Sequence, residues 1–564
     1  MLQKLYTAQG ENLEKTPWQA YPRPQMRREN WLNLNGQWEF AVTADKTIPE
    51  NYDCKILVPF CPESLLSGIG MHFAEGSWLH YRRAFSLPEA ALQGKVLLHF
   101  GAVDQKALIY VNGHLAGSHV GGYEAFSVDI SAYVKQENIL CVATYDDLRD
   151  QSLPYGKQTL TRGGMWYTPV SGIWQTVWVE TVSREYIQAL DIAADGEKAV
   201  ITVTPALSGT VTFDGKTWPL EQGKAVIAPE NPHLWSPEDP YLYTFTVQTD
   251  SDKVESYFAL RSLQIKTVDG ISRLCLNGKP YFFHGLLDQG YWSDGIYTPA
   301  DAQGFQRDIL EMKKLGFNTL RKHIKVEPEQ FYYDCDRLGM IVFQDMVNNS
   351  DYSFFRDTAL PTVGIQKLND KNMHKDPAHR KAFLEGMEAT VSQLKNHPCI
   401  CYWTIFNEAW GQFDSEKVYD ILKAMDDTRF IDATSGWFRQ GKTDVDSLHI
   451  YFGSWSKLKA GNKPLVLSEF GGYCYAAEGH LFNPEKAYGY KTCKTLQEFQ
   501  AGVQELYLQR IVPAAKKGLC AAIYTQVSDV EDEINGFLTY DRKLCKADLQ
   551  AMQEIAKALQ QAVQ

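Results

Sequence analysis

The sequence contains no long hydrophobic run and no block of basic residues. No apolar stretch approaches the roughly 20 residues that span a bilayer, and residues 1–10 lack the apolar centre of a secretory signal. Lys and Arg total 56 against 68 Asp and Glu, which gives a formal net charge of −12. These absences argue against a membrane or nucleic-acid partner and predict a cytoplasmic protein.

Cysteine and histidine spacing provides no metal or redox motif. The eleven cysteines are an odd number without a dense pattern. Cys399 and Cys401 are separated by Ile400 alone, so they form no CxxC pair. Other cysteines lie in apolar runs, where cysteine acts as a small hydrophobic residue. We therefore expect free thiols in a reducing compartment, no metal and no other cofactor.

A chain of 564 residues is too long for one hydrophobic core, and we predict three domains. Within residues 1–183, short strand-like runs alternate with turn signals, and Asn112-Gly113 between two such runs indicates a hairpin. Residues 184–266 repeat the pattern with Pro-rich turns, over a length that suits an immunoglobulin-like sandwich. The first two domains are therefore predicted to be β-sandwiches.

From residue 267 onward, strand-like and helix-like segments alternate. Residues 302–315 have apolar positions at helical spacing and end before Gly316, and residues 317–321 read as the following strand. The alternation continues with helices at 328–338, 380–395, 415–427 and 496–516 and strands at 340–343, 400–406, 465–467 and 520–524. This repeat over 267–564 predicts a closed (β/α)8 barrel with its active site at the carboxyl ends of the strands.

Two apolar segments in this region each end at a glutamate. The run that begins at Cys399 stops at Glu408, and the run that begins at Pro464 stops at Glu469. This pattern is typical of a buried barrel strand that places one acid at its carboxyl end. Two such acids suit retaining glycoside hydrolysis, in which one protonates the leaving oxygen and the other attacks the sugar carbon. Alternatively, each glutamate is a solvated strand end or a helix-capping partner.

Six short motifs occur in a fixed order through the barrel region: 318–321, 336–339, 396–398, 406–408, 468–471 and 524–542. With these motifs the chain resembles glycoside hydrolase family 2, the family of β-galactosidases, β-glucuronidases and β-mannosidases. The resemblance covers nearly the whole chain and implies a short three-domain member. It implies a jelly-roll sandwich, an immunoglobulin-like sandwich and a C-terminal TIM barrel, in that order.

The resemblance also implies roles for individual residues. Glu408 matches the general acid/base and Glu469 the nucleophile, while Asn407 matches a residue that hydrogen-bonds the sugar 2-hydroxyl. Arg321 matches an arginine near the nucleophile, although a structural ion pair is an alternative. His323 follows that arginine by two residues, where familiar β-galactosidases have three, but strand alternation still places both on one face.

Further substrate-binding candidates lie at other strand ends. A tyrosine in the region of Tyr451 commonly contacts the nucleophile in the family, although a core tyrosine is the alternative. Asp288 and Gln289 either bind sugar hydroxyls or only order their loop, and the aromatic loop at 352–355 is a candidate wall of the pocket. The substrate-binding set is completed by His449, Trp410 and Gln526.

Departures from the family pattern bear on the substrate. Residues 343–349 replace the Glu-Thr-His-Gly run of metal-assisted β-galactosidases, so no metal is expected. Glu533 and Asn535 occupy the place of the Asn-x-Lys pair that holds the uronate in β-glucuronidases, and an acid there would repel a uronate. We therefore expect an exo-acting hydrolase of a neutral sugar. A β-D-galactoside is chosen because it is the commonest activity in the family, with arabinosides, galactofuranosides, β-mannosides and β-glucuronides as alternatives.

The sequence also allows two other classes of protein, a carbohydrate-binding protein and an adhesion module. A catalytically silent carbohydrate-binding protein with the same domains would need neither Glu408 nor Glu469, so their presence argues against it. A β-rich adhesion module would predict a secretory signal. The expected partner is an oligosaccharide or small glycoside, and assembly into a homo-oligomer is compatible with the sequence.

Overall fold

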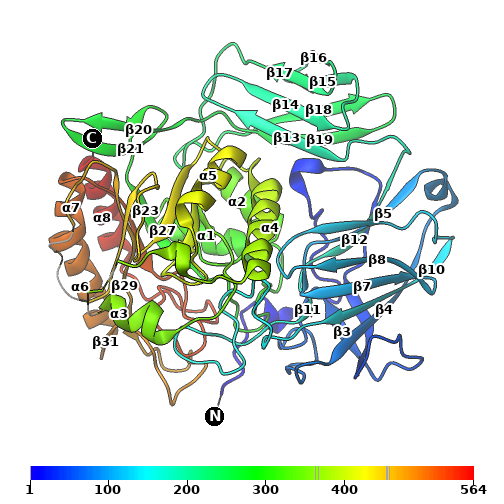
Figure 1. Cartoon of the computed structure of the whole chain (residues 1–564), viewed down its shortest axis with the longest axis horizontal. Helices are drawn as coiled ribbons and strands as arrows, with labels where there is room; N and C mark the ends of the chain where they lie inside the picture. The colour runs from blue at the N-terminus through cyan, green and yellow to red at the C-terminus, as the bar shows by residue number, and fades with distance from the viewer. Residues whose placement is uncertain (1, 363, 366, 453–454, 456–457, 564) are drawn as a thin grey trace.

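The computed structural model describes residues 2–362, 364–365, 367–452, 455 and 458–563. Two β-sandwiches precede a barrel (Figure 1). The blue and cyan strands form the first sandwich at the right of the view, the blue-green strands form the second at the top, and the green to red helices surround the barrel. The predicted fold class, with its jelly-roll sandwich, immunoglobulin-like sandwich and C-terminal TIM barrel, is confirmed.

The first sandwich consists of two antiparallel sheets. One sheet contains, in spatial order, β1 (Trp31–Asn33), β12 (Val177–Val182), β5 (Lys95–Phe100) and β9 (Phe126–Asp129). The other contains β3 (Cys54–Val58), β2 (Gly36–Thr43), β4 (Trp78–Ser86), β10 (Glu137–Tyr145), β7 (Lys106–Val111) and β8 (His114–Val120). Their inward side chains, among them Trp38, Tyr81 and Phe100, form one buried core. A short pair, β6 (Val103–Asp104) and β11 (Gly172–Ile173), lies beside them.

The predicted hairpin joins β7 to β8. Asn112 and Gly113 have φ values of 51° and 84°, the left-handed backbone that a two-residue hairpin turn requires at both positions. The two strands pair in antiparallel fashion on either side of it. Since few residues adopt this conformation without strain, the Asn-Gly pair alone was sufficient to locate this turn.

The second sandwich is smaller. One sheet consists of β13 (Ala189–Ala194), β14 (Ala199–Thr204) and β17 (Lys224–Ile227). The facing sheet consists of β16 (Lys216–Leu220), β15 (Gly209–Phe213), β18 (Tyr243–Thr249) and β19 (Lys253–Phe258). A further sheet of β20 (Leu263–Val268), β21 (Ile271–Leu276) and β22 (Lys279–Pro280) follows. The boundary expected between residues 266 and 267 falls inside β20, and it stays a prediction, as does the boundary at 183.

The barrel is an eight-stranded parallel sheet. Its spatial order is β27 (Phe430–Ser435), β26 (Ile400–Asn407), β25 (Ile341–Asp345), β24 (Thr319–Lys322), β23 (Phe283–Asp288), β32 (Leu519–Thr525), β29 (Leu465–Gly471) and β28 (Asp446–Ile450). The end strands β27 and β28 contact each other, so the sheet is nearly closed. β27 was not among the predicted strands, because Asp432, Thr434 and Ser435 interrupt its apolar pattern. All three are buried, as inward-facing barrel residues are.

Helices cover the outside of the barrel. They are α1 (Gly304–Lys314), α2 (Glu329–Leu338), α3 (Leu360–Thr362), α4 (Pro377–Leu394), α5 (Ser415–Met425), α6 (Leu496–Leu506), α7 (Val512–Lys516) and α8 (Leu549–Gln561). The helix predicted over 496–516 is interrupted by a wide π turn at Tyr507–Ile511. Pro513 lies just beyond this turn, and because proline cannot donate a backbone hydrogen bond, a regular helix could not continue through it.

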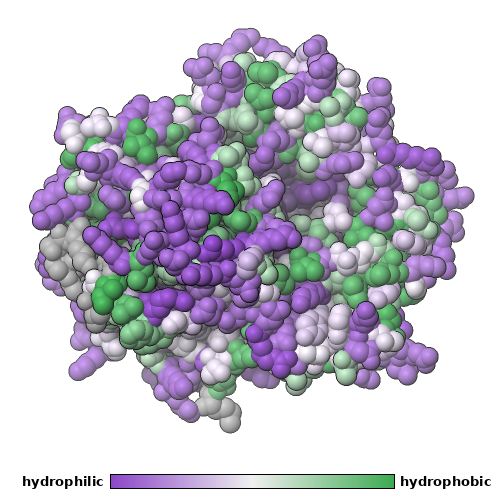
Figure 2. All heavy atoms as spheres, in the orientation of Figure 1, coloured by the Kyte–Doolittle hydropathy of each residue, from purple (hydrophilic) through white to green (hydrophobic). Residues whose placement is uncertain are grey.

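Short elements complete the fold. A π turn at Phe354–Ala359 begins within the aromatic loop, and β30 (Tyr473–Tyr475) pairs with β31 (Lys491–Cys493). Turns of 3-10 helix occur at Gly10–Asn12, Pro24–Met26, Glu89–Gln93 and Asp370–Asn372. In the face shown in Figure 2, hydrophilic residues predominate between small apolar patches, and a hollow lies where the three parts of the chain meet. Within the described residues, no helix is both long and apolar enough to cross a membrane.

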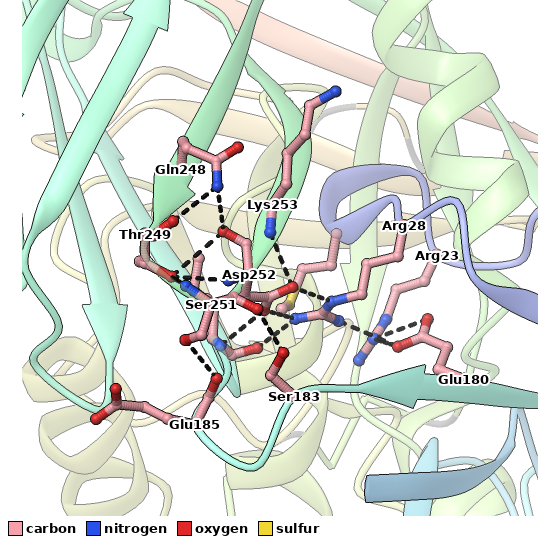
Figure 3. A network of polar contacts seen from close by, with 12 residues as sticks. Arg23, Arg28, Glu180, Ser183, Glu185, Gln248, Thr249, Ser251, Asp252 and Lys253 are labelled. Carbon is pink, nitrogen blue, oxygen red and sulfur yellow. Dashed lines mark hydrogen bonds and ion pairs between the residues drawn. The ribbon is translucent and has the colours of Figure 1, made fainter. Parts of the chain in front are cut away.

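The N-terminal segment ties the three parts together. The Arg28 guanidinium, shown in Figure 3 between two carboxylates, donates to Glu180 on β12 at 3.1 Å and to Asp252 between β18 and β19 at 2.7 Å. Further up the chain, Trp18 donates from its indole to the carbonyl of Pro299 in the barrel at 2.8 Å. The segment therefore contacts both sandwiches and the barrel through specific hydrogen bonds.

Glu180 is ionised at this junction. Its side chain is fully buried, and burial would raise its pKa. The Arg23 guanidinium at 2.9 Å, together with His99 and Arg28, outweighs burial and holds the pKa well below the usual range. Each of these buried charges therefore depends on its partners, because an uncompensated charge in the interior is expensive.

We predict that Arg28→Met destabilises the protein by about 3–5 kcal/mol, because Glu180 and Asp252 lose a shared buried cation. Differential scanning calorimetry would show this as a lower Tm. Arg82→Met is the matched control, since its pair with Glu39 is partly exposed and worth roughly 0–1 kcal/mol. Equal Tm losses in the two variants would contradict this account of the junction.

Candidate active site

The two predicted acids meet at the carboxyl end of the barrel. Glu408 follows β26 and Glu469 lies near the end of β29. They are 8% and 5% exposed. Each carboxylate has an oxygen within 4.8 Å of an oxygen of the other and of a nitrogen of His449. Because all eight strands run parallel, side chains at their carboxyl ends converge on one space, as the sequence predicts.

Glu469 is held in its ionised form. Arg321 donates to its Oε1 at 3.0 Å, and the Tyr451 hydroxyl donates to its Oε2 at 2.5 Å. Burial by itself would raise the pKa of Glu469. The imidazole of His449, the Arg321 guanidinium and the Tyr451 hydrogen bond outweigh it and lower the pKa to about 2. Glu469 is therefore a carboxylate at neutral pH.

Arg321 connects four barrel strands. From β24 it donates to Asp345 on β25 at 3.0 Å and to Asn407 on β26 at 2.9 Å. It also donates to the Ser468 carbonyl on β29 at 3.0 Å, beside its bond to Glu469. The side chain is 1% exposed, so these charge-assisted bonds act in a buried environment where they are strong. One guanidinium thus fixes the relative positions of Asn407 and Glu469.

Glu408 is oriented by a histidine and by unusual backbone geometry. His449 Nδ1 lies 2.7 Å from Oε1 of Glu408, and His449 Nε2 lies 2.9 Å from the Ser435 hydroxyl. Glu408 and Ala409 have φ values of 48° and 67°, in the left-handed region that non-glycine residues rarely adopt. This left-handed pair turns the chain sharply after β26, so that the Glu408 side chain and the Trp410 ring both reach the barrel mouth.

His323 shares the Asp345 carboxylate with Arg321. Its Nδ1 lies 2.8 Å from Asp345 Oδ2, and burial lowers its pKa to about 4, which leaves the ring neutral at physiological pH. The intervening Lys322 instead pairs with Asp288 at 2.6 Å. The predicted alternation is therefore correct: Arg321 and His323 lie on one face, and Lys322 lies on the other.

The remaining candidates occupy different surroundings. Asp288 accepts hydrogen bonds from Lys322 and from the backbone N–H of Gly290, so its contacts are those of a loop-ordering residue. Gln526 donates to Asn535 at 2.8 Å after the end of β32. The Oε1 atoms of Gln526 and Gln289 are buried and have no hydrogen-bond partner among the described residues. Their roles stay predictions.

The first sandwich contributes to the site as well. The segment between β10 and β11 places the Trp166 ring 5.2 Å from Trp410, in a stacked arrangement, and Tyr352 from the aromatic loop packs against both. Next to Trp166, the Tyr167 hydroxyl donates to the Glu533 carboxylate. Phe354 and Phe355 of the aromatic loop are exposed, so of that loop Tyr352 forms the packed wall.

Comparison with known proteins identifies the family. Residues 267–561 match the model described as "Glycosyl hydrolases family 2, TIM barrel domain". Residues 72–181 match its "sugar binding domain", and residues 187–261 match "Glycosyl hydrolases family 2". The chain belongs to glycosyl hydrolase family 2. The resemblance predicted from the six motifs is confirmed.

Individual relatives of this family 2 protein are distant. A β-galactosidase of Thermoanaerobacter pseudethanolicus is 25% identical over 384 residues, which are 63% of this chain and 48% of the relative. The β-glucuronidase of Homo sapiens is 24% identical over 435 residues, 68% of this chain and 60% of the relative. The chain thus spans about half the length of the curated relatives it matches. The solved structure of a β-D-glucuronidase from Dictyoglomus thermophilum has a TM-score of 0.72 at 19% identity, over 96% of this chain and 98% of that one, and shares the fold.

Sequence reasoning did not assign two contacts of this family 2 site. Asp345 lies in the run 343–349 and beyond the strand predicted over 340–343, although a polar residue that ends a buried barrel strand is a detectable signal. Trp166 lies about 240 residues before its partner Trp410, and no local pattern connects them. Contacts between domains of this kind depend on docking, which a single sequence does not reveal.

The same cluster has the donor atoms of a metal site. Glu408, Glu469 and His449 are the one such group found in the described part of the chain. Both nitrogens of His449 already face oxygen partners, and Arg321 supplies the positive charge beside Glu469. A divalent cation would have to displace these contacts, so the residues fit a carboxylate pair better than a metal centre.

We predict that Glu469 makes stability dependent on pH in the acid range. Its pKa is about 2 in the folded protein and near 4.5 ordinarily, so its ionised form stabilises the fold above pH 4.5. This contribution is lost progressively as pH falls toward 2. The Tm difference between wild type and Glu469→Gln should therefore shrink as pH is lowered from about 6 to about 3. Glu50→Gln, at an exposed position, should show no such trend. A Tm difference between wild type and Glu469→Gln that widens on acidification would refute the prediction.

Proposed function

We propose that this family 2 protein is a retaining, exo-acting glycoside hydrolase that removes a terminal neutral sugar by double displacement. The observation that carries this proposal is the pair of carboxylate oxygens within 4.8 Å, one of them on a glutamate whose pKa is lowered to about 2. Retaining enzymes place their carboxyl groups about 5–5.5 Å apart, which leaves no room for a water molecule between acid and sugar. The arrangement supports direct attack by Glu469.

In the first step, Glu469 attacks the anomeric carbon and the glycosidic bond breaks while Glu408 gives its proton to the leaving oxygen. This produces a covalent glycosyl ester and a free alcohol. In the second step, Glu408 takes a proton from water, the resulting nucleophile attacks the same carbon, and the Glu469 carboxylate leaves. Two inversions restore the original configuration, and Glu408 ends the cycle protonated, as it began.

Neighbouring groups support these roles. His449 holds one oxygen of Glu408, which leaves the other to face the glycosidic oxygen. Asn407 accepts from Arg321 through Oδ1, and its Nδ2 makes no hydrogen bond with any described residue. That amide N–H is available to the sugar 2-hydroxyl, the role implied by the family resemblance. Such bonds strengthen as charge develops at the anomeric carbon, so they favour the transition state over the bound substrate.

The charge of Glu533 supports a neutral sugar. This carboxyl group is 2% exposed and accepts from Asn535 at 2.9 Å. Burial raises its pKa, whereas the Lys157 charge and the hydrogen bonds from Tyr167 and Asn535 lower the pKa and favour the ionised form. A buried acid beside the substrate would repel a second carboxylate. We propose a β-D-galactoside, an activity for which one relative is named, while others are named for glucuronides. Assembly into a homo-oligomer stays a prediction.

We predict that Glu408→Ala reduces the hydrolysis of glycosides with poor leaving groups far more than of those with good ones. General-acid assistance of about 10²- to 10⁴-fold matters only when the departing oxygen needs a proton. The measurement compares kcat/KM for unsubstituted phenyl and 2,4-dinitrophenyl β-galactosides. Added azide should restore turnover of the activated substrate by replacing the water that Glu408 activates.

The matched variant is Glu469→Gln, which should lose activity on both substrates because the nucleophile itself is absent. Proton NMR of the first-formed sugar should show the β-anomer. Equal losses on the two substrates in Glu408→Ala would refute the acid/base role. An α-anomer as the first product would refute Glu469 as the nucleophile.

We predict that a nitrophenyl β-galactoside is hydrolysed with a much higher kcat/KM than the matching β-glucuronide. A desolvated like charge costs several kcal/mol, so the expected ratio is on the order of 10² or more. Comparable efficiency on the glucuronide would overturn the neutral-sugar proposal. Activity on arabinosides or galactofuranosides alone would keep the mechanism and replace the sugar.

A further inference from the structure

One buried cation beside the two carboxylates has neither a hydrogen-bond partner nor an ion-pair partner among the described residues. Lys157 lies in the segment between β10 and β11 of the first sandwich and is 5% exposed. Its Nζ lies 4.7 Å from the centroid of the Trp410 ring. With the residues that the structure describes, its ammonium forms neither a hydrogen bond nor an ion pair. A buried ammonium ordinarily has such partners, because its desolvation is costly.

Other buried lysines of this protein follow that rule. Lys322 pairs with Asp288 at 2.6 Å, Lys325 with Glu327 at 2.9 Å, and Lys546 with Asp529 at 2.7 Å. All three are at most 1% exposed. Lys157 is comparably enclosed but presents its three N–H donors to no protein acceptor in the described structure. Its contact with Trp410 satisfies the charge in part, through the face of the ring, and leaves the donors unused.

The ammonium faces the same space as the proposed catalytic pair. Burial lowers the pKa of Lys157, and the charges of Glu533, Glu469 and Glu408, in decreasing order, raise it. The indole beneath it belongs to Trp410, two residues after Glu408. The ring contacts with Trp410 and with Trp166, at 4.7 and 6.0 Å from the two ring centroids, place the ammonium at the mouth of the barrel.

Glu533 can provide the hydrogen-bond acceptor that complements the donors of Lys157. One of its oxygens accepts from Asn535 and the other from the Tyr167 hydroxyl. Each carboxylate oxygen has two lone pairs, so both retain the capacity to accept one more hydrogen bond. Tyr167, which donates to Glu533, directly follows Trp166, whose ring centroid lies 6.0 Å from the Lys157 ammonium. The donor from the sandwich and the acceptor from the barrel therefore adjoin the same two aromatic residues.

The two contributing segments are fixed to each other. Arg162 pairs with Asp532 at 2.9 Å, and the backbone N–H of Thr168 donates to Glu531 at 2.8 Å. These contacts lie on either side of Trp166 in the sandwich segment and directly before Glu533 in the barrel loop. The spacing between Lys157 and Glu533 is therefore set by the docking of the first sandwich on the barrel.

We infer that Lys157 and Glu533 form a specificity-determining pair that binds hydroxyl groups of the terminal neutral sugar. The ammonium donates to one hydroxyl oxygen, and the carboxylate accepts from a hydroxyl group. A hydroxyl both donates and accepts, so neighbouring hydroxyls match a donor and an acceptor held side by side. This inference rests on the proposed function and extends it, because it makes the first sandwich a part of the sugar site.

The local charges favour hydroxyl groups over a sugar carboxylate. Glu533 and Glu469 act on the charge of Lys157, and Asp345 and Glu469 act on that of Arg321. Apart from Glu408, which is protonated when the substrate binds, three carboxylates therefore accompany these two cations. A further carboxylate would add to this excess of negative charge. The stacked rings of Trp166 and Trp410 also offer a flat apolar surface, which suits the C–H face of a pyranose.

The test uses Lys157→Met, which keeps the apolar stem on Trp410 and removes the ammonium. Its kcat/KM on nitrophenyl β-galactoside should fall about 10- to 100-fold, the range for hydrogen bonds to charged groups. The decisive readout is the ratio of the wild-type kcat/KM to that of Lys157→Met, measured on the 3-deoxy, 4-deoxy and 6-deoxy galactosides. The loss should disappear on the one substrate that lacks the hydroxyl bound by Lys157, as in a double-mutant cycle. Lys157→Arg should retain part of the activity.

Lys106→Met, a half-exposed lysine on β7 of the same sandwich, is the matched control and should behave as wild type. Equal losses on all deoxy substrates would show a structural role only and overturn the inference. So would unchanged kinetics in Lys157→Met. A greater loss on nitrophenyl β-galacturonide than on the galactoside would show that the ammonium binds a carboxylate, which also overturns it.

A binding measurement separates this inference from the proposed function. Calorimetry would compare D-galactose binding to Glu469→Gln with binding to the double variant Glu469→Gln/Lys157→Met. Weaker binding to the double variant is expected, and it would support the pair even if the wild type hydrolysed no glycoside. Equal affinity would overturn the inference even if the catalytic assignments of Glu408 and Glu469 were correct.

Discussion

The barrel mouth is organised around one buried cation, the guanidinium of Arg321. It contacts Asp345, Asn407 and Glu469 on three other strands, and its own desolvation is compensated only while all of them stay in place. The same contacts keep Glu469 ionised and fix the Asn407 amide. Position and protonation at this site are therefore two results of one electrostatic arrangement, because the charge that orders the side chains also sets their pKa values.

The side chains around this centre come from two domains, the barrel and the first sandwich. Barrel strands supply the groups proposed to react, and their rigid parallel arrangement fixes the distance between Glu408 and Glu469. The first sandwich supplies Lys157 and Trp166 from a segment that has little regular structure of its own. Loops can change without disturbing a barrel, so a site built in this way can alter its sugar while it retains its chemistry.

Periodicity and motif order predicted the domain sequence, most barrel elements and the convergence of both glutamates. Their signals are local: an apolar run that ends in an acid, or an Asn-Gly turn with φ > 0 at both residues. β27 was missed because its inward face is polar, and the helix around Pro513 was predicted as continuous because a π turn has no simple periodicity. The contact of Lys157 with Trp410 could not be found, since it arises from the docking of segments about 250 residues apart in the chain.

The N-terminal segment has a consequence for biosynthesis. Arg28 has both of its carboxylate partners only after Asp252 has been translated, and Trp18 must wait for Pro299. Domains fold as units while the chain is made, so both sandwiches can form their own cores before the barrel is complete. Trp18 and Arg28 are thus translated before the residues that they bind, and their hydrogen bonds to the barrel and to the second sandwich can form only once those partners are present.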